Sequence, residues 1–183
     1  SSEADLEAIA TMGFRGEALA SIASVSRVRL LTCQRTADAG VLVEIDGGVM
    51  KRSGHAASPP GTTIEVRHLF SNAPARLKFL KSPATEFSHI VSAVAHQAMA
   101  RPGVRFRLTH DGSAVLDLPA ALTLRDRAFQ ILGGEIAEHL REFAGQREPA
   151  RLSGLIGEPN YSRGDKSYQE FYVNGRFVRN AAL

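Results

Sequence analysis

The chain has 183 residues, 44% of them hydrophobic and 22% charged, with a formal net charge of +3. This composition is typical of a globular protein, and no apolar run reaches the roughly 20 residues that cross a bilayer. With Cys33 as its single cysteine, the chain cannot form an internal disulfide. We expect Cys33 to be a packing residue, and we expect the protein to lie in the reducing cytoplasm. The polar residues 1–5 predict no signal peptide.

Apolar periodicity and turn residues predict the elements of the first half of the chain. They are a helical turn at 5–10, a helix beginning near residue 17, strands at 28–33, 41–45 and 62–67, and a loop at 53–61. A tight turn at 46–48 returns the chain through Val49 as a hairpin. Further on, Asn72 is suited to cap a helix and Pro74 to occupy its first turn.

In the second half, the longest segment with apolar residues at helical spacing predicts a helix over 82–101. Pro102 and Gly103 are expected to end this helix. After it come a hairpin at 104–118, a linker at 119–123, a helix from Thr123 to Leu132, strands at 151–157 and 169–173, and a type I′ turn at 174–175 leading into 176–179. A change in composition places a domain boundary near residue 120.

Gly13 and Gly16 stand directly before the helix that begins near residue 17. Helix starts expose unpaired backbone N–H groups and the positive end of the helix dipole, and glycine lets an anion approach them closely. The pattern indicates either an anion-binding loop or a plain turn. The six histidines show no metal-ligand spacing and no nucleophile–base arrangement can be identified, so the sequence predicts neither a metal site nor a catalytic residue.

Three strings of the sequence resemble motifs of the MutL family of DNA mismatch repair proteins. The spacing between the strings and the order of the elements also agree with that family, so the resemblance extends over nearly the whole chain. Residues 13–26, which begin Gly-Phe-Arg-Gly-Glu-Ala-Leu, resemble the end of the ATP lid in that family's GHKL-type ATPase. Residues 72–80 resemble Asn-Thr-Pro-Ala-Arg-Arg-Lys-Phe-Leu, with Ala73 and Leu77 in place of threonine and arginine. Residues 172–179 resemble the Tyr-Val-Asn-Gly-Arg hairpin of the family's second domain.

The resemblance implies an α+β fold in two parts. Residues 1–120 correspond to the C-terminal part of a GHKL-type ATPase α/β sandwich, with the lid end, a sheet and a helix. Residues 121–183 correspond to the start of a second α/β domain, which is transducer-like and has the βαβ fold of a ribosomal protein.

The resemblance also implies a nucleotide-binding surface. Its expected residues are Gly13, Phe14, Arg15, Gly16, Glu17, Ala18, Leu19, Thr62 and Thr63. The backbone N–H groups of 13–19 would face the phosphates, and Arg15 would supply either charge to the site or a surface salt bridge. Glu17 is expected to cap the helix or to anchor the lid. The two threonines either lie near the nucleotide or serve only as residues of high β propensity.

ATP and Mg²⁺ are the cofactors that the resemblance implies for the complete protein. The family's water-activating glutamate, magnesium-binding asparagine, adenine-binding Asp-x-Gly-x-Gly segment and second-domain lysine have no counterpart in this chain. We therefore expect no bound nucleotide and no ATP hydrolysis from the chain alone, since phosphoryl transfer depends on such groups.

A DNA contact is expected at Arg163, Lys166, Arg176 and Arg179, which lie in a polar loop and beside a hairpin tip. The net charge of +3 permits this contact without requiring it, and a solvated surface is the alternative. Such contacts would go to phosphates, and binding would be independent of sequence and sensitive to salt.

The resemblance implies that the complete protein is a cytoplasmic, ATP-gated clamp that dimerises and couples mismatch recognition to repair. Its expected partners are DNA, a mismatch-sensor protein, a downstream nuclease or helicase, and a second copy of itself. Two other classes remain open: a basic α/β nucleic-acid-binding module without a nucleotide site, and another GHKL ATPase such as a type II topoisomerase subunit. The string at 13–17 argues against the first and the string at 72–76 against the second.

Overall fold

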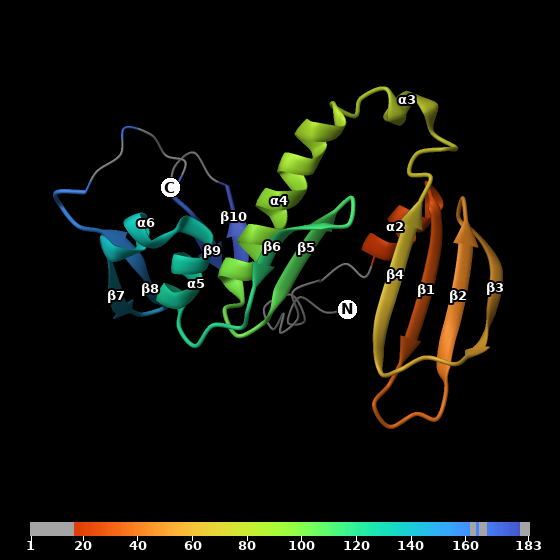
Figure 1. The fold of residues 1–183 in the computed structure, drawn as a ribbon, viewed down its shortest axis with the longest axis horizontal. Helices are drawn as coiled ribbons and strands as arrows, with labels where there is room; N and C mark the ends of the chain where they lie inside the picture. The colour runs from red at the N-terminus through yellow and green to blue at the C-terminus, as the bar shows by residue number, and fades with distance from the viewer. Residues whose placement is uncertain (1–16, 162–163, 165–167, 180–183) are drawn as a thin grey trace. The chain divides into compact units, whose positions relative to one another are not determined.

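The computed structural model describes residues 17–161, 164 and 168–179 (Figure 1). The helical turn expected at 5–10, the lid residues 13–16, and Arg163 and Lys166 lie outside the described residues.

The contacts within the chain divide it into two compact units, residues 1–81 and 82–183. This division differs from the boundary near residue 120 that the sequence predicts. The elements between residues 82 and 120 contact elements that follow them, so they join the second unit. A change in composition reports local preferences and carries no information on these long-range contacts.

The first unit is built on a four-stranded antiparallel sheet with the strand order β3-β2-β1-β4 (Figure 1). Its strands are β1 (Arg27–Cys33), β2 (Gly40–Asp46), β3 (Val49–Ala56) and β4 (Gly61–Arg67), with α2 (Ala18–Ser24) before them and α3 (Pro74–Leu77) after them. The helix, the strands and the hairpin turn predicted for this region are confirmed.

Strand β3 is longer than its sequence predicts, because residues 53–56 continue the strand where a loop is expected. Ser53, Gly54 and His55 extend the antiparallel ladder with β2. Their side chains show no apolar alternation, but the backbone groups of β2 require partners along the whole strand. The prediction of a loop is therefore wrong for residues 53–56.

The register sorts the strand side chains into two faces, since residues directly opposite one another share a face. One face is apolar and carries Val28, Leu30, Val43, Ile45, Ile64 and Val66. The opposite face carries charged residues toward the start of β1. On the apolar face Val28 is buried, whereas Ile64 and Val66 are each 44% exposed among the described residues.

The second unit begins with α4 (Pro83–Ala100), whose N-cap Ser82 accepts a hydrogen bond from the backbone N–H of Thr85. Antiparallel hairpins and short helices follow α4 in the described residues (Figure 1). They are β5 (Phe106–His110) with β6 (Ser113–Leu118), α5 (Leu124–Leu132), α6 (Gly134–Glu138), β7 (Leu140–Arg147) with β8 (Ala150–Gly157), and β9 (Phe171–Val173) with β10 (Arg176–Val178). No helix in this described part of the chain is both long and apolar enough to cross a membrane.

Most elements of the second unit are those that the sequence predicts, and Thr123 caps α5 in a capping box with Asp126. Helix α6 and strand β7 are additional. Helix α6 has only five residues, and β7 is exposed at seven of its eight positions, so neither has an apolar pattern to reveal it. Strand β7 forms because β8 supplies partners for its backbone.

Arg127 of α5 is fully buried and ties this helix to the segment before β5. Its guanidinium donates to the backbone oxygens of Pro102 (2.7 Å) and Val104 (2.6 Å) and to Oε1 of Gln130 (2.9 Å). Nε has no partner among the described residues, and burial lowers the pKa of this guanidinium. An arginine suits the position because its planar fork reaches several acceptors at once.

We expect Arg127→Lys to lower the free energy of unfolding by about 2 kcal/mol, because one ammonium group cannot replace these three hydrogen bonds. Arg125→Lys on the exposed side of α5 is the matched control, with an expected change within about 0.5 kcal/mol. Urea denaturation followed by circular dichroism measures both. Equal midpoints for the two variants would show that the buried fork is not required.

Candidate functional site

The end of α2 meets two turns that are distant from it in the sequence. Residues 23–26 form hydrogen bonds with the turn at 46–48 between β2 and β3, and with the turn at 68–72 that follows β4. We call this contact the α2 junction. It lies within the first unit and brings the string at 13–26 against the string at 72–80.

Backbone hydrogen bonds account for most of the α2 junction. They run from Gly48 N–H to the oxygen of Ala23 (2.8 Å), from Gly47 N–H to that of Ser26 (3.0 Å) and from Phe70 N–H to that of Val25 (2.6 Å). The last carbonyl groups of a helix have no partner within the helix, and these bonds supply partners for them. The α2 junction therefore closes the C-terminal end of α2 with residues from elsewhere in the chain.

The turn at 68–72 adopts a backbone conformation that is unfavourable for residues with a Cβ atom. His68 has φ 53° and Phe70 has φ 64°, both in the left-handed region. Such residues cost on the order of 1–3 kcal/mol each and persist only where surrounding contacts hold them. Ser26 is also fixed here, since it is buried and its Oγ donates to the oxygen of Ile22 at 2.6 Å.

Asn72 does not cap α3, in contrast to the sequence prediction. Ala73 occupies the N-cap position of this short helix. The side-chain amide of Asn72 instead donates from Nδ2 to the oxygen of Ser24 at 2.9 Å. A capping pattern is local, whereas this acceptor lies on α2, so the sequence spacing alone could not reveal it. Pro74 does occupy the first turn of α3, as predicted.

The N-terminal end of α2 is exposed. Glu17 occupies the N-cap position of α2, but its side chain makes no capping hydrogen bond within the described residues. The alternative role, anchoring of the lid, involves residues outside the described ones and stays a prediction. The carbonyl of Glu17 accepts from the N–H of Ser21 at 2.8 Å. The first N–H groups of α2, those of Ala18 to Ala20, have no acceptor within the helix and lie at exposed positions.

Thr62 and Thr63 are successive residues of β4 and therefore point to opposite faces of the sheet. Thr62 lies opposite Thr32, and the two hydroxyl oxygens are 2.8 Å apart. It shares the apolar face with Ile64, whereas Thr63 shares the charged face. A ligand on one face can contact only one of these two threonines.

The turn at 174–175 has φ 50° at Asn174 and 73° at Gly175, which confirms the predicted type I′ hairpin. A Cβ at Gly175 would clash with a guanidinium nitrogen of Arg101, so glycine also permits this close approach. Arg101 directly follows α4. The tip of the hairpin is thus packed within the second unit.

The hairpin is further held by the ring of His96, which stacks on Phe177 with centroids 3.8 Å apart. Nε2 of His96 lies 3.4 Å from Oε1 of Glu170, and Tyr172 Oη donates to the other oxygen of this carboxylate. Burial, and then the hydrogen bond and charge of Glu170, raise the pKa of Tyr172. Sequence reasoning missed His96 and Glu170, since neither lies in a recognisable motif.

Of the four residues expected to contact DNA, the structure describes Arg176 and Arg179. Arg176 is half-buried in β10, and Arg179 is exposed, with its guanidinium 5.8 Å from the ring centroid of Phe177. In the described part of the chain no three His, Cys, Asp or Glu side chains are grouped so that they could hold a metal ion.

Similar solved structures define the class of this fold. The structure is similar to that of the Aquifex aeolicus MutL ATPase domain complexed with ADP, with a TM-score of 0.76 and 27% identity over 100% of this chain and 68% of that chain. It is also similar to the N-terminal domain of a DNA repair protein, with a TM-score of 0.76 and 25% identity over 94% of this chain and 58% of that chain. The fold is the mixed α/β fold of MutL-type ATPase domains, of the GHKL class.

Sequence comparison agrees. DNA mismatch repair protein MutL of Anaeromyxobacter sp. (strain K) is 48% identical over 177 residues, and that of Lactobacillus acidophilus is 41% identical over 183 residues. These matches cover 97% and 100% of this chain and 29% of each relative, so the chain spans less than a third of their length. The family described as DNA mismatch repair protein, C-terminal domain, matches residues 128–183. The chain belongs to the MutL family of DNA mismatch repair proteins.

We expect Asn72→Ala to destabilise the first unit by about 1 kcal/mol, because it removes the hydrogen bond to the oxygen of Ser24. Ser71→Ala is the matched control at the neighbouring exposed position, with an expected change near zero. The shift of the urea midpoint, read from hydrogen exchange of β1–β4 amides, measures both. Identical midpoints for the two variants would show that the hydrogen bond of Asn72 does not stabilise the α2 junction.

Proposed function

We propose that this protein acts in DNA mismatch repair as a nucleotide-dependent clamp. The observation that carries the proposal is the α2 junction, where Asn72 of one family string donates to Ser24 of another. In a clamp of this kind, ATP binding at the lid would move α2, and the α2 junction would transmit that movement to the segment at 72–80. A nucleic-acid-binding module without a nucleotide site has no use for this connection.

For the complete protein, the proposed nucleotide is ATP with Mg²⁺, lying against residues 13–19. The N–H groups at the start of α2 support this, because they have no acceptor within the helix and belong to residues that are exposed among the described ones. Thr62 would lie on the nucleotide side if the site faces the apolar side of the sheet, and Thr63 if it faces the charged side. Phosphate charge would hold the lid in place through these N–H groups. We propose no magnesium ligand among the described residues.

The proposed partners are DNA, a mismatch-sensor protein, a downstream nuclease or helicase, and a second copy of the protein, in the cytoplasm. The DNA contact is proposed at Arg163, Lys166, Arg176 and Arg179. The exposed position of Arg179 supports a role for this residue. Its contact would go to phosphate and would be independent of base sequence.

A chimaera tests the proposed function. The matching 177 residues of the Anaeromyxobacter MutL are replaced by those of this chain, and the protein is expressed in bacteria that lack their own MutL. We expect the mutation frequency to fall to the level given by the unaltered Anaeromyxobacter protein, because the replaced segment performs the same task. The unaltered protein and an empty vector are the controls.

The outcome that contradicts the proposal is a chimaera that is expressed and folded, as judged by circular dichroism, but leaves the mutation frequency at the empty-vector level. The residues of this chain would then not support mismatch repair in place of their relatives.

We further expect Arg179→Glu to reduce by about 1 the slope of log affinity for duplex DNA against log salt concentration, since one phosphate contact is lost. Arg125→Glu, at an exposed position of α5, is the control for the change in net charge. Fluorescence anisotropy of a labelled duplex over a salt series gives both slopes. If both variants change the slope equally, Arg179 makes no specific contact.

A further inference from the structure

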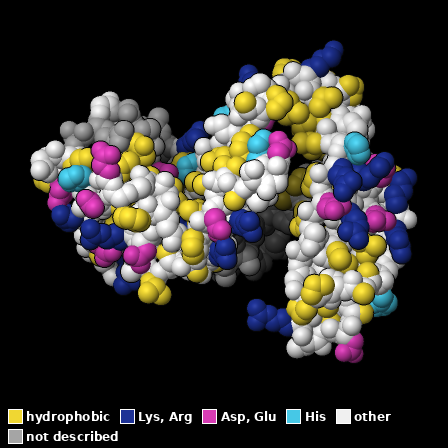
Figure 2. Space-filling model, in the orientation of Figure 1, with side chains coloured by type: hydrophobic (Ala, Val, Ile, Leu, Met, Phe, Trp, Pro, Cys, Tyr) yellow, Lys and Arg dark blue, Asp and Glu magenta, His cyan; other side chains and the backbone are white. Residues whose placement is uncertain are grey.

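The charged face of the four-stranded sheet holds an ordered array of ionic side chains. The register places Arg27 between Asp46 and Arg67 in one row. The next row along the strands reads Arg52, Glu44, Arg29 and Glu65 from β3 to β4. Figure 2 shows Lys and Arg side chains gathered with Asp and Glu over the body that contains this sheet. An open cavity of about 620 Å³ is lined by these row residues other than Arg52.

Every carboxylate of these two rows is paired with an arginine. Arg27 donates from Nε and Nη2 to Oδ2 of Asp46 at 3.1 and 3.0 Å. The nearest nitrogen–oxygen distance is 3.6 Å both for Arg29 with Glu44 and for Arg67 with Glu65. Of the three pairs, the structure gives hydrogen bonds to Arg27–Asp46, and the pairs do not consume all of the guanidinium donors. The acidic residues therefore do not leave a net negative charge on this face.

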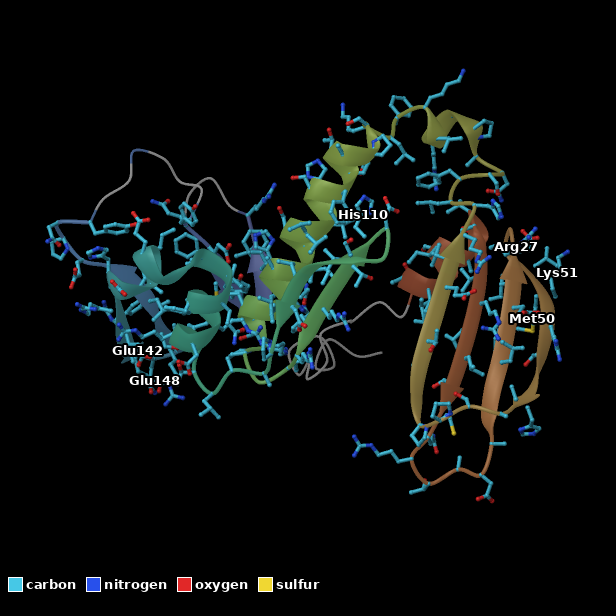
Figure 3. All side chains as sticks on the ribbon, in the orientation of Figure 1. Arg27, Met50, Lys51, His110, Glu142 and Glu148 are labelled. Carbon is cyan, nitrogen blue, oxygen red and sulfur yellow. The ribbon has the colours of Figure 1, made fainter. Side chains whose placement is uncertain are left out.

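Positive charge remains on the outer strand β3. Lys51 and Arg52 form no ion pair or side-chain hydrogen bond with any described residue. The β2–β3 register shifts between Glu44 and Ile45, and Lys51 is the additional residue of this bulge. Bulges re-aim side chains, and here Lys51 lines the cavity over the charged face. Figure 3 places Arg27 and Lys51 at the same end of the sheet.

The spacing of the cations matches a double-stranded polyanion. Lys51 and Arg52 on β3 are three strand spacings from Arg67 on β4, which is about 14 Å. The major groove of B-DNA is about 12 Å wide between its two phosphate backbones. Cations on the two outer strands would thus reach the phosphates on either side of one groove.

We propose that this charged face binds the phosphate backbone of duplex nucleic acid, with Lys51 and Arg52 contacting one strand and Arg67 the other. The inference rests on the proposed function only in that both require DNA binding, and it adds a site in the first unit. A single strand is a poorer match, because the strands place no aromatic ring on this face for bases to stack on. An acidic peptide is a poorer match, because the two charged rows offer it one apolar position, Val49 opposite Asp46 on the edge strand.

The test measures binding of a labelled DNA duplex to the 183-residue chain over a salt series. The double variant K51E/R52E should bind more weakly and should reduce the slope of log affinity against log salt by about 2, one unit for each phosphate contact. The control R147E/R151E makes the same change in net charge at the exposed β7–β8 hairpin end and should leave the slope nearly unchanged. Circular dichroism melting of each variant establishes that it is folded.

Each other result overturns the assignment in a distinguishable way. If the unaltered chain binds no duplex even at low salt, the DNA contacts of the proposed function fail together with this site. If it binds and K51E/R52E has the unaltered slope, only this site fails. If both double variants lose the same amount, binding follows net charge and has no site on this face. If polyglutamate binds the chain more tightly than the duplex and K51E/R52E abolishes that binding, the face recognises an acidic protein.

Discussion

The α2 junction is the interaction on which the first unit depends, because α2 cannot hold its place by itself. The helix has seven residues, and isolated helices shorter than about 12 residues are marginal in water. Of its residues only Ala23 is buried, so packing contributes little to its position. The hydrogen bonds from Gly48, Phe70 and Asn72 to its last carbonyl groups therefore decide where it lies. They also explain why the strained turn at 68–72 is retained: its backbone supplies one of these donors.

This arrangement gives the family strings a physical reason to occur together. The string at 13–26 ends on α2, the string at 72–80 begins with the residue that bonds to α2, and the turn at 46–48 completes the contact. In a nucleotide-dependent clamp, the lid would be linked through α2 to the rest of the sheet in this way. In the second unit the string at 172–179 is held separately, by the stacking of His96 on Phe177 and the approach of Arg101 to Gly175.

The sequence was a good guide wherever local preference and final structure agree. Alternation located β4, apolar runs and turn residues located β1 and β2, and Thr123 marked the start of α5. The same reasoning missed the end of β3 and the whole of β7, because both are made by backbone pairing with a neighbouring strand and lack an apolar face of their own. Sequence reasoning also could not identify the partner of Asn72. The same side-chain amide can serve either in a local helix cap or in a hydrogen bond to a distant residue, and the sequence does not distinguish the two. The candidate site was accessible mainly through whole strings, and the two threonines show the limit of that approach, because adjacent strand residues cannot both face one ligand.

The central claim, that the α2 junction fixes α2 against the sheet, is tested most directly by native-state hydrogen exchange of the Gly48 and Phe70 amides. Both N–H groups donate to carbonyl groups at the end of α2. We predict that they exchange about as slowly as the amides of β1, which lies between two partner strands. Exchange as fast as that of the amides between β3 and β4 at 57–58 would contradict it, because the α2 junction would then open independently of the sheet.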